Sequence, residues 1–210
     1  MGALGFYNSG NKYSYKGATP LTDAMFGIRY IISNDEIWAS NLSLCEQTEN
    51  KYIYDNQQNL ALGYMVNPGV TQWKIVEGDP FVTQNDFVRM ATDTQGAMFI
   101  PLETGEPQVT DGMLTSTGED KYYYERHGSG GSLTWQLTFT EQQDVYIYFE
   151  ASHCEKLKVT IARKSETYYD KRRHIVHLGE CDAGKVVTFD FAMGSDHETG
   201  NLNLQLYACN

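Results

Sequence analysis

The sequence predicts a mainly β (α+β) protein, with a small N-terminal α/β unit followed by a jelly-roll-like β-sandwich. Fifteen Tyr and nine Phe, set among few long apolar runs, favour strands over helices. Beyond residue 107, short apolar runs alternate with turn residues at the intervals typical of sandwiches. We therefore expect an α/β subdomain over residues 1–105 and a sandwich over residues 106–210.

Residues 19–33, TPLTDAMFGIRYIIS, predict a short helix that turns into a buried strand. Pro20 suits the first helical turn, where its missing N–H costs nothing. Gly27 is a natural stop, because glycine adopts a left-handed conformation without strain. The β-branched and aromatic residues that follow are typical of a strand. The large apolar side chains of the helix fall on one face: Leu21, Met25 and Phe26.

The rest of the N-terminal half predicts strands over residues 51–54, 60–66 and 97–100 and one helix over residues 79–92. Asp79 and Pro80 are suitable N-cap and first-turn residues for that helix. We expect its buried face to carry Phe81, Phe87, Val88 and Met90. Residues 1–18 read as an irregular, partly extended lead-in, and residues 38–50 are polar and ambiguous.

The second half predicts eight short strands without helices. One of them alternates clearly, with Leu133, Trp135, Leu137 and Phe139 on one face and polar residues between them. The predicted strands cover residues 108–115, 122–125, 133–139, 145–149, 157–161, 175–178, 186–191 and 202–207.

The chain of 210 residues carries a formal net charge of −11, with a pI near 4.8. This charge argues against binding nucleic acid, because phosphate binding needs a basic surface that releases counterions. It also argues against docking on anionic lipid through a basic patch. The longest charge-free run, residues 56–73, is rich in Asn, Gln and Thr, and no run approaches the ~20 apolar residues of a membrane span.

The residue types that bind metals or cofactors form no recognisable motif, so we predict no metal, no cofactor and no catalytic residue. Cys45, Cys154, Cys181 and Cys209 lack the close spacing of zinc ligands, and either disulfides or buried thiols remain open for them. His174 and His177 should point to opposite faces of a strand. The cluster at residues 196–198 reads as a hydrated turn.

Aromatic residues are the more promising site candidates. Tyr122, Tyr124, Arg126 and Trp135 together predict a sugar-binding platform, because aromatic rings cover the apolar face of a pyranose while polar groups bind its hydroxyls. The alternative is that Trp135 and one Tyr of each alternating pair belong to the core. The basic run at residues 168–173 is either a contact for an anionic polymer or a solvated loop.

Three strings of the sequence stand out: one in residues 19–33, a second, YDNQQNLALGY, at residues 54–64, and a third, Asn85-Asp86-Phe87, after Pro80-Phe81. In this order they resemble the extracytoplasmic part of YfhO-type bacterial membrane proteins. One departure is Ala61, which stands where the family usually has Pro. Over residues 5–100 the resemblance extends to specific residues. The remainder resembles the family only in its pattern of strands.

This resemblance implies a glycosyltransferase-like parent of the GT-C kind, which takes a sugar from a polyprenyl-phosphate carrier and places it on a cell-envelope polymer such as a teichoic acid. The chain would be its soluble extracytoplasmic domain at the cell membrane, without turnover of its own. Its expected partners are the glycopolymer or sugar acceptor and the transmembrane part of the same protein. The alternative is a free-standing carbohydrate-binding module or adhesion domain.

Overall fold

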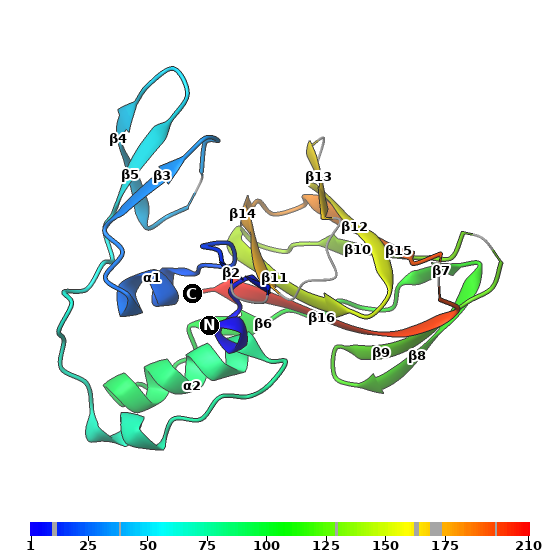
Figure 1. Cartoon of the computed structure of the whole chain (residues 1–210), viewed down its shortest axis with the longest axis horizontal. Coiled ribbons are helices and arrows are strands. Elements are labelled where there is room, and N and C mark those ends of the chain that lie inside the picture. Colours follow the sequence, from blue (N-terminus) through cyan, green and yellow to red (C-terminus); the bar gives the residue numbers. More distant parts are fainter. Residues whose placement is uncertain (10–11, 38, 129, 162–163, 169–173, 196) are drawn as a thin grey trace.

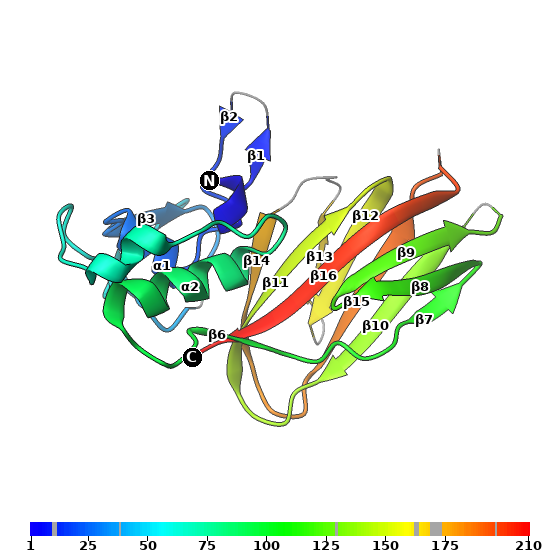
Figure 2. The same cartoon turned by 90° about the horizontal axis from the view of Figure 1, so that it is seen from below.

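Two antiparallel sheets that pack face to face form the larger part of the molecule (Figures 1 and 2). The computed structural model describes residues 1–9, 12–37, 39–128, 130–161, 164–168, 174–195 and 197–210. One sheet has the strand order β13-β12-β15-β10-β7, and the other has the order β14-β11-β16-β9-β8 with β6 paired to β16. Most connections cross between the sheets, as in a jelly roll, so the predicted sandwich is confirmed.

The sandwich strands match the predicted runs closely, with two differences. The first predicted run is split into two strands at Asp111, whose φ of 47° interrupts the extended backbone. The hairpin partner β13 was not predicted, because its residues lack an apolar period. The strands are β6 (Phe99–Pro101), β7 (Gln108–Thr110), β8 (Gly112–Gly118), β9 (Lys121–Arg126), β10 (Ser132–Thr138), β11 (Gln143–Ala151), β12 (Cys154–Ile161), β13 (Lys164–Tyr168), β14 (His174–Cys181), β15 (Val186–Met193) and β16 (Thr199–Cys209).

The N-terminal unit contains a three-stranded antiparallel sheet of order β3-β5-β4 and two α-helices. Its elements are the 3-10 helices η1 (Gly2–Leu4) and η2 (Pro68–Gln72), the hairpin β1 (Asn8–Ser9) and β2 (Lys12–Tyr13), the helices α1 (Pro20–Met25) and α2 (Pro80–Thr92), and the strands β3 (Tyr30–Ser33), β4 (Leu42–Gln47) and β5 (Tyr52–Asn56). The strand predicted over residues 60–66 is wrong: this segment is an irregular loop. The polar β4 instead completes the sheet, because its backbone pairs with β5 although its side chains are mostly exposed.

Helix α1 begins and ends as predicted, but its buried face differs from the expected one. The side chains of Thr22 and Asp23 are buried, whereas Phe26, which caps the helix, is exposed. The helix therefore buries polar side chains where the sequence predicts apolar ones. Gly27 has a φ of 62°, which confirms it as the left-handed stop.

Helix α2 lies against the outer face of the second sheet. Phe81 stacks on Tyr207 of β16, with ring centroids 4.2 Å apart, and lies 5.2 Å from Phe99 of β6. These rings join Tyr146, Tyr148 and Ile175 in a small second core, separate from the large core between the sheets. Three expected members of the buried face, Phe87, Val88 and Met90, are only half-buried. The division into residues 1–105 and 106–210 stays a proposal, and β6 pairs across it.

Candidate functional site

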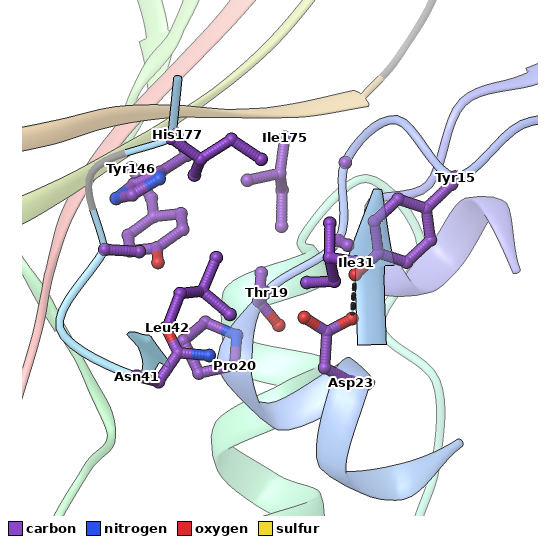
Figure 3. Close-up of a pocket in the computed structure, with 14 residues that line it drawn as sticks. Tyr15, Thr19, Pro20, Asp23, Ile31, Asn41, Leu42, Tyr146, Ile175 and His177 are labelled. Atoms are coloured by element: carbon purple, nitrogen blue, oxygen red, sulfur yellow. Dashed lines mark hydrogen bonds between the residues drawn. The ribbon is translucent and has the colours of Figure 1, made fainter. Parts of the chain in front are cut away.

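A pocket of about 200 Å³ opens where α1, β3 and the start of β4 face the outer side of β11 and β14 (Figure 3). Its apolar walls come from both units of the molecule and include Ile31, Leu42 and Ile175. Its polar lining residues are Tyr15, Thr19, Asp23, Asn41, Tyr146 and His177.

Local hydrogen bonds fix the segment that forms one wall of the pocket. Thr19 caps α1: its hydroxyl accepts from the Thr22 amide at 3.2 Å, and the Thr22 hydroxyl accepts from the Thr19 amide at 2.8 Å. The Thr19 hydroxyl also donates to the Gln84 side chain of α2 at 2.6 Å. Gly17 has a φ of +92°, and a Cβ there would lie 2.1 Å from the carbonyl oxygen of Gly5. Only glycine therefore allows this close approach of the two backbone segments.

Asp23 is the buried acid of the pocket, with 5% of the residue exposed. Its Oδ1 accepts a hydrogen bond from the Tyr15 hydroxyl at 2.5 Å (Figure 3). Burial raises the pKa of Asp23 to about 6, and the hydrogen bond from Tyr15 only partly opposes this rise. Near neutral pH this carboxyl can therefore both accept and, when protonated, donate a hydrogen bond.

Tyr146 and His177 form the opposite wall. Their rings stack with centroids 4.4 Å apart, and His177 Nε2 lies 2.5 Å from Asp144 Oδ1. The Tyr146 hydroxyl donates to the other Asp144 oxygen at 3.2 Å. Burial, followed by the nearby Asp144 charge, raises the pKa of Tyr146 well above its ordinary value, so the phenol stays neutral. The pocket thus combines three aromatic rings, hydroxyls, an amide and a carboxyl.

The raised pKa of Asp23 predicts a pH-dependent stability. The pKa of Asp23 is about 6 in the folded chain and near 3.8 in the unfolded chain. The stability contributed by the protonated Asp23 is therefore complete below about pH 4 and is lost as the pH rises through about 6. The difference corresponds to at most about 3 kcal/mol. We expect Asp23→Asn to stabilise the chain more at about pH 7.5 than at about pH 4.5 in urea unfolding experiments.

Asp86→Asn is the matched control, since Asp86 lies only half-buried on α2, in an ion pair with the exposed Arg89. Its effect should be small at both pH values. The same gain from Asp23→Asn at both pH values would contradict the ionisation of a buried Asp23. Asp120, whose pKa burial also raises to about 6, keeps part of the pH dependence in the variant.

The four residues predicted as a sugar platform lie elsewhere, in and beside the core of the sandwich. Tyr124 and Trp135 are 0% and 1% exposed, which confirms the core alternative for both. Tyr122 is half-buried, and its ring lies 5.9 Å from that of Trp135. The Arg126 guanidinium donates to the backbone carbonyls of Ser195 and His197 at 3.0 and 3.4 Å. A role of these four residues in binding sugar stays a prediction.

The other candidates from the sequence have mixed outcomes. His174 pairs with Phe149 and His177 with Tyr146, on opposite faces of the sheet as predicted. Cys45, Cys181 and Cys209 are free thiols, whereas the side chain of Cys154 and most of the basic run at residues 168–173 lie outside the described residues. Among the residues that the structure does describe, there is no group of three or more metal-ligating side chains.

Sequence reasoning missed the pocket because its walls are far apart in the chain. Tyr15 and Asp23 come from one end of the sequence, and Tyr146 and His177 from the other. One signal was present: a capped helix that carries Asp23 within the residues that hold the family resemblance. A buried acid at this position indicates a functional site, whereas an exposed acid would belong to an ordinary solvated helix face.

Several solved structures match about half of the chain. One is a family 35 carbohydrate binding module from Clostridium thermocellum, at 13% identity and a TM-score of 0.35 over 52% of this chain and 96% of that chain. A family 29 module from Piromyces equi has 8% identity and a TM-score of 0.34 over 55% and 83% of the two chains. The secreted serine protease VesC from Vibrio cholerae has 16% identity and a TM-score of 0.40 over 51% and 25%. TM-scores below 0.5 carry no inference about what this chain binds.

Sequence comparison gives one finding at the level of the family. No curated protein matches the chain. The family model described as "Bacterial membrane protein YfhO" matches residues 1–210. In the parts of the chain that the structure describes, no helix has the length and apolar character needed to cross a membrane.

Proposed function

This chain belongs to the YfhO family of bacterial membrane proteins, and we propose that it holds an acceptor glycan for the membrane part of such a protein. In this proposal the domain lies on the extracytoplasmic face of the cell membrane. The parent is a glycosyltransferase of the GT-C kind that transfers a sugar from a polyprenyl phosphate to a polymer of the teichoic acid type. The domain contributes recognition and bracing, and the membrane part contributes the chemistry.

The observation that carries this proposal is the pocket between the two units. The residues that hold the family resemblance supply one wall, through Thr19, Asp23 and Ile31. The sandwich supplies the other wall, through Tyr146 and His177. Convergent polar groups set among apolar side chains in a concavity are typical of sites for small ligands. At about 200 Å³ the pocket is smaller than the ~300–1,000 Å³ of drug-sized sites, which suits a single sugar unit.

The charges of the pocket indicate which part of the acceptor it takes. None of the lining residues that the structure describes is Lys or Arg, and Asp23 and the neighbouring Asp144 are acids. Together with the net charge of −11, these acids would repel a phosphate group. We therefore propose that the pocket takes a neutral sugar unit, or one with an ammonium substituent, while the polymer phosphates stay in solvent.

The alternative of a free-standing carbohydrate-binding module has less support, because the family model covers residues 1–210 and not the sandwich alone. A simple module needs only a sandwich and accessible aromatic rings. Here the N-terminal unit builds half of the pocket. A glycan-binding role for the pocket is thus tied to the elements that distinguish the family.

Isothermal titration with teichoic-type polymers and their component sugars tests the proposal. We expect binding by the unaltered chain and at least an about ten-fold loss in Ala39→Trp, because an indole at this lining position fills the pocket. Ala183→Trp is the control, since Ala183 lies in an exposed turn of the sandwich. Equal binding by both variants, or no binding of any polymer or sugar, would contradict a glycan site in the pocket.

A further inference from the structure

The most exposed apolar side chains of the molecule gather at one end of the N-terminal unit. Leu62 is 97% exposed and Met65 is 100% exposed. They belong to the loop between β5 and η2, which runs along the outside of the molecule (Figure 1). Together with four neighbouring exposed side chains they form what we call the tip patch: Phe26, Tyr30, Leu60, Leu62, Tyr64 and Met65.

Contacts between the loop and the end of α1 hold the tip patch together. The Tyr64 hydroxyl donates to the Met25 carbonyl at 3.5 Å. A Cβ at Gly27 would lie 3.1 Å from the Leu60 carbonyl oxygen and 3.8 Å from the Leu62 side chain. The end of helix α1 and the loop therefore lie side by side, with Leu62 next to Gly27. Large apolar side chains exposed on neighbouring segments are typical of an interaction site.

The charge pattern points to the chemistry of the partner. The chain has 27 Asp and Glu residues, yet residues 56–73, which carry four members of the tip patch, contain no charged residue. Beside Tyr30 lies Arg29, whose guanidinium carbon is 5.1 Å from the centroid of the Tyr30 ring and whose side chain is 62% exposed. Arg29 also forms an ion pair with Asp55 of β5 at 3.5 Å, so the nearby carboxylate is paired. Apolar side chains flanked by Tyr and Arg, with carboxylates excluded from the loop, match the gradient of a membrane interface.

We propose that the tip patch inserts into the outer part of a lipid bilayer, with Leu62 and Met65 among the acyl chains and Tyr30, Tyr64 and Arg29 at the headgroups. The irregular loop backbone stays in the headgroup layer, because its polar groups would be unsatisfied in hydrocarbon. The inference rests on membership in a membrane protein family and not on glycan recognition. Since the chain is strongly acidic, the proposal requires no anionic lipid.

Both ends of the chain lie at the same end of the molecule as α1 and α2 (Figures 1 and 2). A histidine tag at either end therefore allows the protein to be tethered to phosphatidylcholine vesicles that contain a nickel-chelating lipid. An environment-sensitive nitrobenzoxadiazole group is placed at Leu62→Cys, in a Cys45→Ser background that removes the native thiol that is exposed among those the structure describes. Met113→Cys is the control position, because Met113 is exposed on β8 of the sandwich.

The label at residue 62 should shift to the blue on tethering and lose about half of its emission or more to doxyl-labelled lipid. The label at residue 113 should change in neither respect. Adding Met65→Asp should reduce the quenching at residue 62, because a carboxylate resists entry into the acyl region. The proposal would be overturned if the label at residue 62 showed no quenching with either tag position. It would also be overturned if sedimentation showed that the chain self-associates through the patch.

Discussion

Replacing Trp135 by alanine is expected to lower the free energy of unfolding by about 3–5 kcal/mol. The side chain is 1% exposed and belongs to the core between the two sheets, and its backbone pairs with Phe189 of β15. Truncation would leave a cavity in a close-packed interior. Urea unfolding followed by circular dichroism measures this loss, which is a large share of the stability of a typical domain.

Two variants control this prediction. Tyr122→Ala removes a neighbouring ring that is only half-buried, so its cost should be clearly smaller. Trp135→Phe keeps a buried ring and should cost less than Trp135→Ala. It also removes an indole N–H that has no hydrogen-bond partner among the described residues, and this gain offsets part of the free energy lost with the smaller ring. If Trp135→Ala lowered the free energy of unfolding by less than about 1 kcal/mol, Trp135 would not lie in the core. That result would favour the surface platform predicted from the sequence.

Replacing Phe81 by alanine should cost about 3–5 kcal/mol as well, for a different reason. Phe81 is fully buried between α2 and the sandwich, where it stacks on Tyr207 and contacts Phe99. Its loss removes aromatic contacts worth about 0.5–1.5 kcal/mol each in addition to buried area. We expect one shared unfolding transition at lower urea, because the N-terminal unit and the sandwich share this second core.

Phe87→Ala on the same helix is the control, since Phe87 is half-buried and contacts Trp73 rather than the sandwich. Its effect should be distinctly smaller. Circular dichroism and tryptophan fluorescence should report the same midpoint. Separate transitions for the two probes in the unaltered chain would show that the subdomains over residues 1–105 and 106–210 are stable independently.

Local signals were enough to predict most of the fold. Pro20 and Gly27 mark the start and the end of α1, because each residue type has a backbone preference that needs no tertiary partner. The alternation of Leu133, Trp135 and Leu137 identified β10 and its inward face for the same reason. By contrast, β4 forms because it pairs with the free edge of β5. The polar residues of β4 give no local signal of this pairing.

The candidate site was predictable only in part, because burial depends on what packs above each residue. Tyr124 and Trp135 have the composition of a sugar platform, but the facing sheet covers them. Asp23 looks like an ordinary helix acid until β3 and the sandwich enclose it. The apolar run at residues 60–66 predicts a strand wrongly, because a short run of this kind has no distinctive period. Its exposure is visible only in the folded chain.

A titration followed by two-dimensional ¹H–¹⁵N NMR tests the central claim, that the pocket between the two units is a glycan site. With a teichoic-type polymer or its component sugar, we expect the largest shift changes at the amides of Asp23, Asn41 and His177, and their loss in Ala39→Trp. Changes confined to β9 around Tyr122 and Arg126, or no changes with any of these glycans, would contradict the claim.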